Sequence, residues 1–302
     1  MNILQVEHLN KQYPGFRLDD VSFSVEEGSI MGFIGRNGAG KTTTIKSILN
    51  LVHADGGSVR FLGSDLWANE TACRKQIGLV LGMFSYYPRK KLRTIADVTR
   101  KFYADWDEDL YQQLLRRFSL DPEKKINELS QGMRVKFSLA LALSHDAKLL
   151  ILDEPTSGLD PVSRDELLDI FRTIIEDGAH SILFSTHIIS DLEKCADYIT
   201  YIKGGKILCS TDAESFKDAY RLVSGEAEQI ERYRKQLVGY RAHAFGFTGL
   251  MPRDDAARAT DLKIAPADME SIMIYTEKED GHERHLPDTR QLSRATPARS
   301  SA

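Results

Sequence analysis

The fold of this chain is decided by the stretch Gly35-Arg36-Asn37-Gly38-Ala39-Gly40-Lys41-Thr42. It fits the pattern of a phosphate-binding loop, in which a glycine and four further residues precede Gly-Lys-Thr. The apolar run 29–34 before it has the length of a strand, and residues 43–49 after it carry apolar side chains at helical spacing. A strand, a glycine-rich loop and a helix in this order predict a site for the phosphates of a nucleotide.

The residue types of this loop suit the chemistry of phosphate binding. Glycines allow tight turns that bring backbone N–H groups close to phosphate oxygens, and the start of the next helix adds partial positive charge. We expect Lys41 to reach the β- and γ-phosphates and the Thr42 hydroxyl to coordinate Mg²⁺. Taken alone, the stretch is also compatible with a glycine-rich turn that carries a chance lysine. The predicted nucleotide contacts are Gly35, Asn37, Gly38, Ala39, Gly40, Lys41, Thr42 and Thr43.

A second motif places two carboxylates directly after a buried strand, in Leu149-Leu150-Ile151-Leu152-Asp153-Glu154. Open α/β sheets bind their ligands at the carboxyl ends of the strands. We expect Asp153 to hold the Mg²⁺ that Thr42 also contacts, and Glu154 to orient and polarise the attacking water. His187 stands at the end of a further predicted strand at 180–186 and is a candidate for the γ-phosphate site. The alternatives are an acidic turn and a surface histidine.

Two more residues have both a functional and a structural interpretation. Tyr13 ends the first predicted strand segment, where its ring would either stack on a nucleotide base or serve as an ordinary strand-end tyrosine. Ser130 stands before a helical pattern and is a typical N-cap.

Composition excludes several classes of protein. The 302 residues carry a formal net charge of -4, with 42% hydrophobic and 28% charged residues, which is ordinary for a globular protein and lacks the basic excess typical of nucleic-acid binding. Three scattered cysteines indicate reduced thiols in a cytosolic protein. The histidines have no metal-ligand spacing, no apolar run reaches the length of a membrane span, and residues 1–7 are too short and polar for a signal peptide.

Changes in pattern divide the chain into three parts. Residues 1–220 form the first module, in which residues 3–34 predict short alternating strands and about 83–147 an inserted helical subdomain. Residues 221–276 predict a small C-terminal extension, and residues 277–302 a disordered tail. The apolar side chains proposed for the core of the extension are Phe245, Phe247, Leu250, Ile272, Met273 and Ile274.

Together these stretches resemble the ATP-binding subunit of ABC transporters over residues 1 to about 220. Residues 35–42 match the Walker A loop and residues 149–154 the Walker B strand. Leu129-Ser130-Gln131-Gly132-Met133 is similar to the signature LSGGQ, with Gln131 and Met133 as departures. The resemblance makes Ser157-Gly158-Leu159-Asp160 the D loop, His187 the switch histidine and Tyr13 the aromatic that stacks on adenine.

The resemblance implies an α/β fold of the P-loop NTPase, ABC ATPase type, with a RecA-like core, an antiparallel β subdomain and an inserted helical subdomain. It implies an ATPase that uses ATP and Mg²⁺ in a head-to-tail dimer, homomeric or with a related chain. Each ATP would lie on Lys41 and Thr42 of one subunit and be closed over by Ser130 and Gly132 of the other, with Asp160 also at this interface. Loss of the γ-phosphate would open the dimer.

The implied partners are a separate membrane permease and a second ATP-binding subunit, with no nucleic acid. The chain would be cytoplasmic, held at the inner face of the cell membrane by its permease. The subgroup that it resembles contains bacterial multidrug and peptide-antibiotic export systems.

One departure from the family pattern bears on function. A glutamine that contacts Mg²⁺ and the attacking water is normal after the strand that ends at Leu81, and Gly82 stands there instead. Either another residue of the loop 82–91 performs the coupling, or hydrolysis is slower. The missing glutamine supports one alternative function, a nucleotide-gated regulatory subunit. A second alternative is a soluble ABC ATPase outside transport that acts on nucleic acid or ribosomes, although such proteins usually carry two ATPase modules, long coiled coils or zinc insertions.

Overall fold

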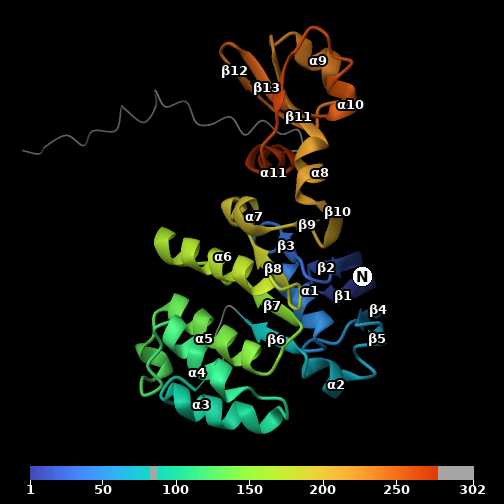
Figure 1. Cartoon of the computed structure of the whole chain (residues 1–302). Helices are drawn as coiled ribbons and strands as arrows, with labels where there is room; N and C mark the ends of the chain where they lie inside the picture. Colours follow the sequence, from blue (N-terminus) through green and yellow to red (C-terminus); the bar gives the residue numbers. More distant parts are fainter. Residues whose placement is uncertain (82–86, 278–302) are drawn as a thin grey trace, which may run out of the picture. The chain divides into compact units, whose positions relative to one another are not determined.

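The computed structural model describes residues 1–81 and 87–277. The chain divides between Phe216 and Lys217 into two compact units, and Figure 1 labels the elements of both. Every helix in the described residues is too short or too polar to cross a bilayer.

The first unit begins with an antiparallel sheet. Its strands are β1 (Asn2–Tyr13), β2 (Phe16–Glu26), β4 (Gly56–Phe61) and β5 (Ser64–Asp65). Within the described residues they pair in the order β2-β1-β4-β5.

Strands β1 and β2 are longer than the short segments that the sequence predicts. The polar–apolar alternation breaks where His8 and Asp20 adopt φ of 53° and 56°, and the strand register shifts at the same places. These irregularities resemble β-bulges, which disturb the alternation without ending the strand. The predicted strands between residues 3 and 34 are therefore confirmed, whereas their predicted shortness was wrong for β1 and β2.

A second, mostly parallel sheet carries the glycine-rich loop. Its strands are β3 (Ile30–Ile34), β6 (Ile77–Val80), β7 (Leu149–Asp153), β8 (Ser181–Thr186), β9 (Tyr198–Lys203) and β10 (Lys206–Asp212). Their order in the described residues is β10-β9-β3-β8-β7-β6, with β10 antiparallel to β9. Every residue of β3, β7 and β8 is buried, as expected for continuous apolar strands covered on both faces. Because these three strands are parallel neighbours, their carboxyl ends lie at one edge.

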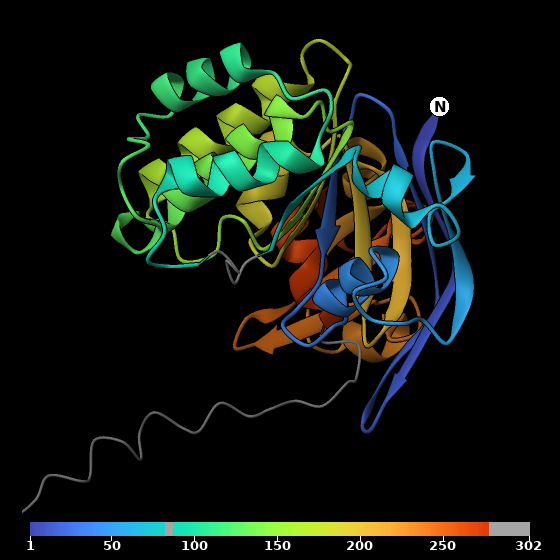
Figure 2. The ribbon, with the colours of Figure 1, turned by 90° about the horizontal axis from the view of Figure 1, so that it is seen from below.

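Eight α-helices lie between residues 41 and 218 in the described part of the chain. They are α1 (Lys41–Ile48), α2 (Glu70–Arg74), α3 (Leu92–Thr99), α4 (Glu108–Arg117), α5 (Gln131–Ser144), α6 (Pro161–Ile175), α7 (Ile189–Cys195) and α8 (Ala213–Asp218), with 3₁₀ turns at Arg100–Phe102 and Ile126–Glu128. Figures 1 and 2 both show α3, α4 and α5 grouped together in green, within the range where the sequence predicts the helical subdomain.

Capping side chains fix where three of these helices begin. The Asp107 carboxylate accepts from the N–H of Leu110 at the start of α4, and the Ser130 hydroxyl accepts from the N–H of Met133 at the start of α5. The Asp160 carboxylate caps α6. Two motif residues, Ser130 and Asp160, therefore define helix ends as well as candidate binding positions.

One apolar core joins the antiparallel sheet, α1 and the parallel sheet. The ring of Phe23 on β2 stacks on the ring of Phe33 on β3, with centroids 5.3 Å apart. Burial of each large apolar side chain stabilises the fold by about 1.5–3 kcal/mol. This packing holds the strand that leads into the glycine-rich loop.

The second unit is an antiparallel sheet with helices. Its elements are β11 (Tyr220–Gly225), α9 (Gln229–Tyr233), β12 (Gly239–His243), β13 (Gly246–Pro252), α10 (Arg253–Ala256), β14 (Lys263–Pro266) and α11 (Met269–Glu277). The strand order in the described residues is β12-β13-β11-β14. From β11 to β14 this is the β-α-β-β-α-β sequence of ferredoxin-like units.

The core of this unit differs in part from the prediction. Phe247, Leu250 and Ile272 are buried as expected, as is Met273, but Phe245 is 93% exposed and Ile274 is 41% exposed. Phe245 lies in the tight turn between β12 and β13, where its side chain follows neither strand. The prediction for these two residues was therefore wrong. Residues 278–302 of the predicted tail lie outside the described residues.

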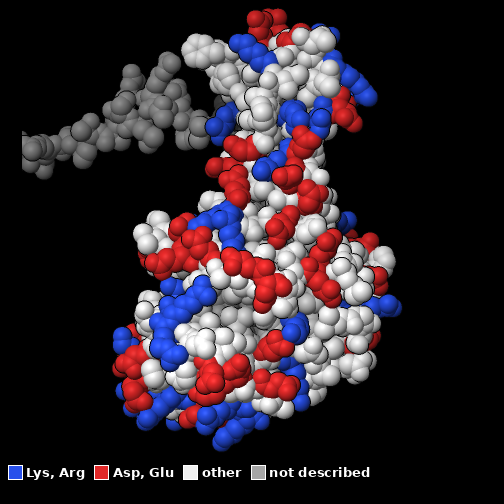
Figure 3. All heavy atoms as spheres, viewed as in Figure 1, with Lys and Arg blue, Asp and Glu red and all other residues white. Residues whose placement is uncertain are grey.

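The surface carries charges of both signs. On the face in Figure 3, Lys and Arg side chains lie interspersed with Asp and Glu side chains. This mixture fits the formal net charge of only -4.

Candidate functional site

The glycine-rich loop joins β3 to α1. Gly38 and Gly40 have φ of 82° and 116°, in the left-handed region that favours glycine. A Cβ atom on Gly35 would lie 2.4 Å from the carbonyl oxygen of Ile202 on β9. The N–H of Gly205 donates to the carbonyl of Ala39 at 3.0 Å, which ties the loop to the β9–β10 turn. The loop backbone is therefore fixed at the carboxyl edge of the parallel sheet.

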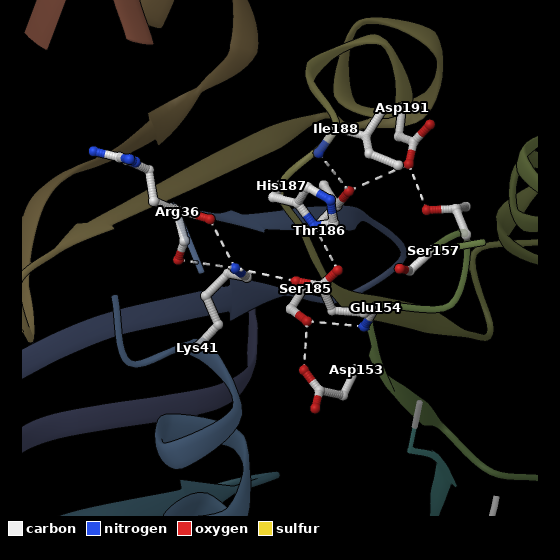
Figure 4. Close-up of polar contacts among 12 residues, drawn as sticks. Arg36, Lys41, Asp153, Glu154, Ser157, Ser185, Thr186, His187, Ile188 and Asp191 are labelled. Atoms are coloured by element: carbon white, nitrogen blue, oxygen red, sulfur yellow. Dashed lines mark hydrogen bonds and ion pairs between the residues drawn. The ribbon is translucent and has the colours of Figure 1, made fainter. Parts of the chain in front are cut away.

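Lys41 lies inside this loop with its side chain buried. Its Nζ donates to the carbonyl oxygens of Gly35 at 2.7 Å and Arg36 at 3.3 Å, and lies 3.1 Å from Glu154 Oε1 (Figure 4). The ammonium group is thus held by three oxygen atoms at the point where the loop meets the end of β7. The neighbouring candidates Asn37 and Thr42 are exposed and Thr43 is half-buried.

Asp153 is the last residue of β7 and is 7% exposed. Its Oδ2 accepts from the Thr42 hydroxyl at 2.8 Å, and its Oδ1 accepts from the Ser185 hydroxyl at 2.6 Å. Ser185 was not among the predicted site residues. A polar side chain within the apolar strand 181–186 is the signal that could have found it.

The Thr42 hydroxyl and the Asp153 carboxylate are a pair of hard oxygen donors, which Mg²⁺ prefers. In residues 1–81 and 87–277, no cluster of three or more His, Cys, Asp or Glu side chains is arranged to hold a metal ion. A donor pair of this kind nevertheless fits Mg²⁺, because this ion is usually held by one or two protein groups together with phosphate oxygens and water.

Glu154 follows Asp153 in a turn with φ of 52°. Its N–H donates to the Ser185 hydroxyl at 2.9 Å, and its Oε2 lies 2.6 Å from Nδ1 of His187. His187 comes directly after β8, the neighbour of β7 in the sheet. Adjacent strand ends therefore bring Lys41, Asp153, Glu154 and His187 together, as the sequence predicted for strand-end residues (Figure 4).

The remaining predicted residues lie on other elements. Ser130 and Gly132 stand at the start of α5, and Asp160 stands before α6. Tyr13 ends β1 and pairs across the hairpin with Phe16, whose ring would lie 3.0 Å from a Cβ atom on Gly40. Phe16 was not predicted, and it connects the Tyr13 hairpin to the glycine-rich loop. Gly82, where the family pattern calls for glutamine, lies outside the described residues.

A buried carboxylate behind the site was also missed. Asp191 on α7 is fully buried, and its Oδ2 accepts from the hydroxyls of Thr156 at 2.5 Å and Thr186 at 3.2 Å (Figure 4). Its Oδ1 lies 3.9 Å from Nε of Arg164, and neither atom has a hydrogen-bond partner among the described residues. Burial raises the pKa of the Asp191 carboxyl, against the opposing effects of both threonine hydroxyls, Arg164 and His187.

Replacing Asp191 with alanine is expected to lower the free energy of unfolding by about 3 kcal/mol. The change leaves the hydroxyls of Thr156 and Thr186 buried without their acceptor, which costs about 1–3 kcal/mol for each. The cost of burying the Asp191 carboxylate disappears at the same time and offsets part of this loss. Urea denaturation of the full chain measures the effect. Asp191→Asn retains an acceptor oxygen and is expected to lose less.

The pH dependence provides the control. Because the folded chain binds the Asp191 proton more tightly than the unfolded chain, the contribution of this carboxyl is largest below its unfolded pKa and is lost as pH rises through the raised pKa. The wild-type chain should therefore gain stability relative to Asp191→Asn as pH falls through the raised pKa toward the unfolded value near 3.8. An Asp191→Ala variant as stable as wild type would contradict the assigned network.

Comparison with known proteins agrees with this geometry. Residues 18–157 match the family model described as ABC transporter. The chain is 29% identical over 265 residues to "ABC transporter ATP-binding protein YtrB" of Bacillus subtilis (strain 168), covering 86% of this chain and 90% of that protein. It is 32% identical over 209 residues to "Bacitracin transport ATP-binding protein BcrA" of Bacillus licheniformis, covering 68% of each.

A solved structure is similar as well. The structure titled "Structure of ATP binding subunit of ABC transporter" superposes with a TM-score of 0.63 at 28% sequence identity, over 71% of this chain and 92% of that chain. The 71% of this chain that it covers is about the length of the first unit, Met1–Phe216.

Proposed function

The chain belongs to the family of ABC transporter ATP-binding proteins, and we propose that it powers a separate membrane permease by ATP-driven closure of a dimer. Members of this family bind and hydrolyse ATP, dimerise and work with permease subunits. The observation that carries the proposal is the meeting of Lys41, Glu154 and His187, at 3.1 Å and 2.6 Å, on one sheet edge beside a phosphate-binding loop.

The loop binds the triphosphate in this account. Its backbone N–H groups and the start of α1 face the phosphate oxygens, and the Lys41 ammonium contacts the β- and γ-phosphates. Thr42 and Asp153 would hold Mg²⁺, which neutralises negative charge on these phosphate oxygens. Tyr13 stacks on the adenine, beside the Phe16 ring that lies against the loop.

Glu154 then acts on water. Its carboxylate orients a water molecule and accepts its proton, while the water oxygen bonds to the γ-phosphorus and the bond from that phosphorus to the ADP oxygen breaks. His187 Nδ1 lies 2.6 Å from Glu154 Oε2, and this contact supports the proposal that His187 orients the carboxylate and contacts the γ-phosphate. The products are ADP and inorganic phosphate.

The second subunit completes the site. We place Ser130 and Gly132 at the start of α5 against the γ-phosphate bound by the partner, because a helix N-terminus with a hydroxyl suits an anion. Asp160 belongs to the same interface. Loss of the γ-phosphate removes this contact and opens the dimer.

Direction and location follow from the proposed partner. We propose export, in line with the resemblance to multidrug and peptide-antibiotic systems and with the relative named for bacitracin transport. The chain would then act at the cytoplasmic face of the membrane, bound to its permease.

The purified full chain is expected to hydrolyse ATP with Mg²⁺ and to lose about 100-fold or more of this rate when EDTA removes the metal. The reason is that charge neutralisation by a metal ion contributes several kcal/mol to phosphoryl transfer. Phosphate release at steady state measures the rate. Turnover that persists in EDTA would contradict the role of Thr42 and Asp153. A chain that binds ATP with Mg²⁺ and never turns it over would favour the regulatory alternative.

A further inference from the structure

Gln131 makes a contact that the family signature does not provide. The signature has glycine at this position, whereas the Gln131 amide Nε2 donates to the carbonyl oxygen of Ser157 at 2.6 Å. Its Oε1 would lie 3.0 Å from a Cβ atom on Gly158. The side chain of the first residue of α5 thus lies along the D loop (Ser157–Asp160) of its own subunit.

Hydrogen bonds also hold the two ends of the D loop. Thr156, directly before it, donates its hydroxyl to buried Asp191 at 2.5 Å, and the Asp160 carboxylate accepts from the N–H groups of Val162 and Ser163. Between these points Gly158 turns the chain with φ of 73°. Gln131 therefore binds the D loop at the turn between its two anchored ends.

The packing beside this hydrogen bond continues the contact between α5 and α6. A Cβ atom on Gly132 would lie 3.6 Å from Leu159, which is 8% exposed. Farther along the helices, Lys136 Nζ lies 2.8 Å from Glu166 Oε2. The start of α5, the D loop and the start of α6 consequently form one packed body.

We propose that Gln131 is a positioning residue that holds the D loop against the start of α5. Both segments of one subunit would then contact the partner as a single ordered surface. The inference rests on the proposed head-to-tail dimer. Association is stronger when the contacting segments are already ordered, because less conformational freedom is lost on binding. Without the Gln131 amide, the D loop would have to become ordered as the dimer closes.

The test uses the full chain carrying Glu154→Gln, which is expected to hold ATP without turnover, and measures its dimer dissociation constant in ATP by sedimentation. Adding Gln131→Met preserves side-chain length and removes the donor. The dimer dissociation constant is expected to rise about tenfold, because one hydrogen bond that orders the D loop is lost. The ATP affinity of the dilute monomer should stay unchanged. A general loss of structure would weaken both ATP binding and dimerisation.

The matched control is Gln112→Met on α4, where the amide donates to Glu108 of the same helix at 2.8 Å. It should dimerise like the parent. Gln131→Gly, the family residue, serves as a second variant and should weaken the dimer like Gln131→Met. Equal dimerisation of the parent and both Gln131 variants would overturn this inference alone. A parent chain that stays monomeric in ATP would overturn the proposed dimer and this inference with it.

Discussion

Replacing Glu154 with glutamine is expected to lower the ATP turnover of the full chain by about 10²–10⁴-fold, the usual contribution of a general base. The amide has the size of the carboxylate and retains an oxygen for Lys41, whose Nζ lies 3.1 Å from Oε1. It cannot accept the proton of the attacking water. ATP binding should therefore persist, or become tighter as one negative charge near the phosphates is removed, and the ATP-bound dimer should accumulate.

Single-turnover hydrolysis and nucleotide binding on the same preparation separate the two effects. Glu193→Gln, an exposed carboxylate on α7, is the control and should hydrolyse ATP at the wild-type rate. Rapid hydrolysis by Glu154→Gln would show that the base is another residue.

Replacing Lys41 with alanine is expected to weaken ATP binding about 100-fold. The ammonium group is buried and held by the carbonyl oxygens of Gly35 and Arg36, so it is already in place for the phosphates. Each hydrogen bond to a charged group contributes about 1.5–3 kcal/mol, and two such bonds to the β- and γ-phosphates correspond to at least a 100-fold change. The loss of Lys41 also leaves Glu154 facing the triphosphate without a neighbouring positive charge.

Titration with a fluorescent ATP analogue measures this change. Lys46→Ala, on the same helix α1 but in its last turn, tests whether removal of any lysine from this region has the effect, and should bind nearly as wild type. Unchanged affinity in Lys41→Ala would rule against the phosphate-binding loop.

The parts of the candidate site that lie within one short stretch could be located from the sequence. The loop 35–42 and the carboxylates after 149–152 were recognised because glycine spacing and an apolar strand are local patterns. His187 was predicted from its position at a strand end, and the pairing of β7 with β8 explains why it lies beside Glu154: parallel neighbours end at the same edge.

The missed contacts join residues that are far apart in the sequence. Ser185 bonds to Asp153 because the two are register partners on β7 and β8. Asp191 bonds to Thr156 from a helix 35 residues away, and Gln131 reaches Ser157 over 26 residues. In the sequence, Asp191 is an ordinary acidic residue in a helix and Gln131 only a departure from a motif.

The fold errors have a similar origin. Bulges in β1 and β2 disturb the alternation that defines a strand, so these two strands are longer than the sequence predicted. Phe245 was assigned to a core by its residue type, yet it occupies a hairpin turn and is exposed. In both cases the backbone conformation, with its local turns and register shifts, decides the outcome rather than hydrophobicity.

The measurement that tests the central claim most directly is co-purification of the tagged full chain from detergent-solubilised native membranes, with the accompanying proteins identified and quantified. A polytopic membrane protein is expected at matching stoichiometry, retained by the wild-type chain through washing and absent from a tag-only control. If the chain came down alone, or with ribosomes or a soluble complex, the transport function would be contradicted and a soluble ATPase would take its place.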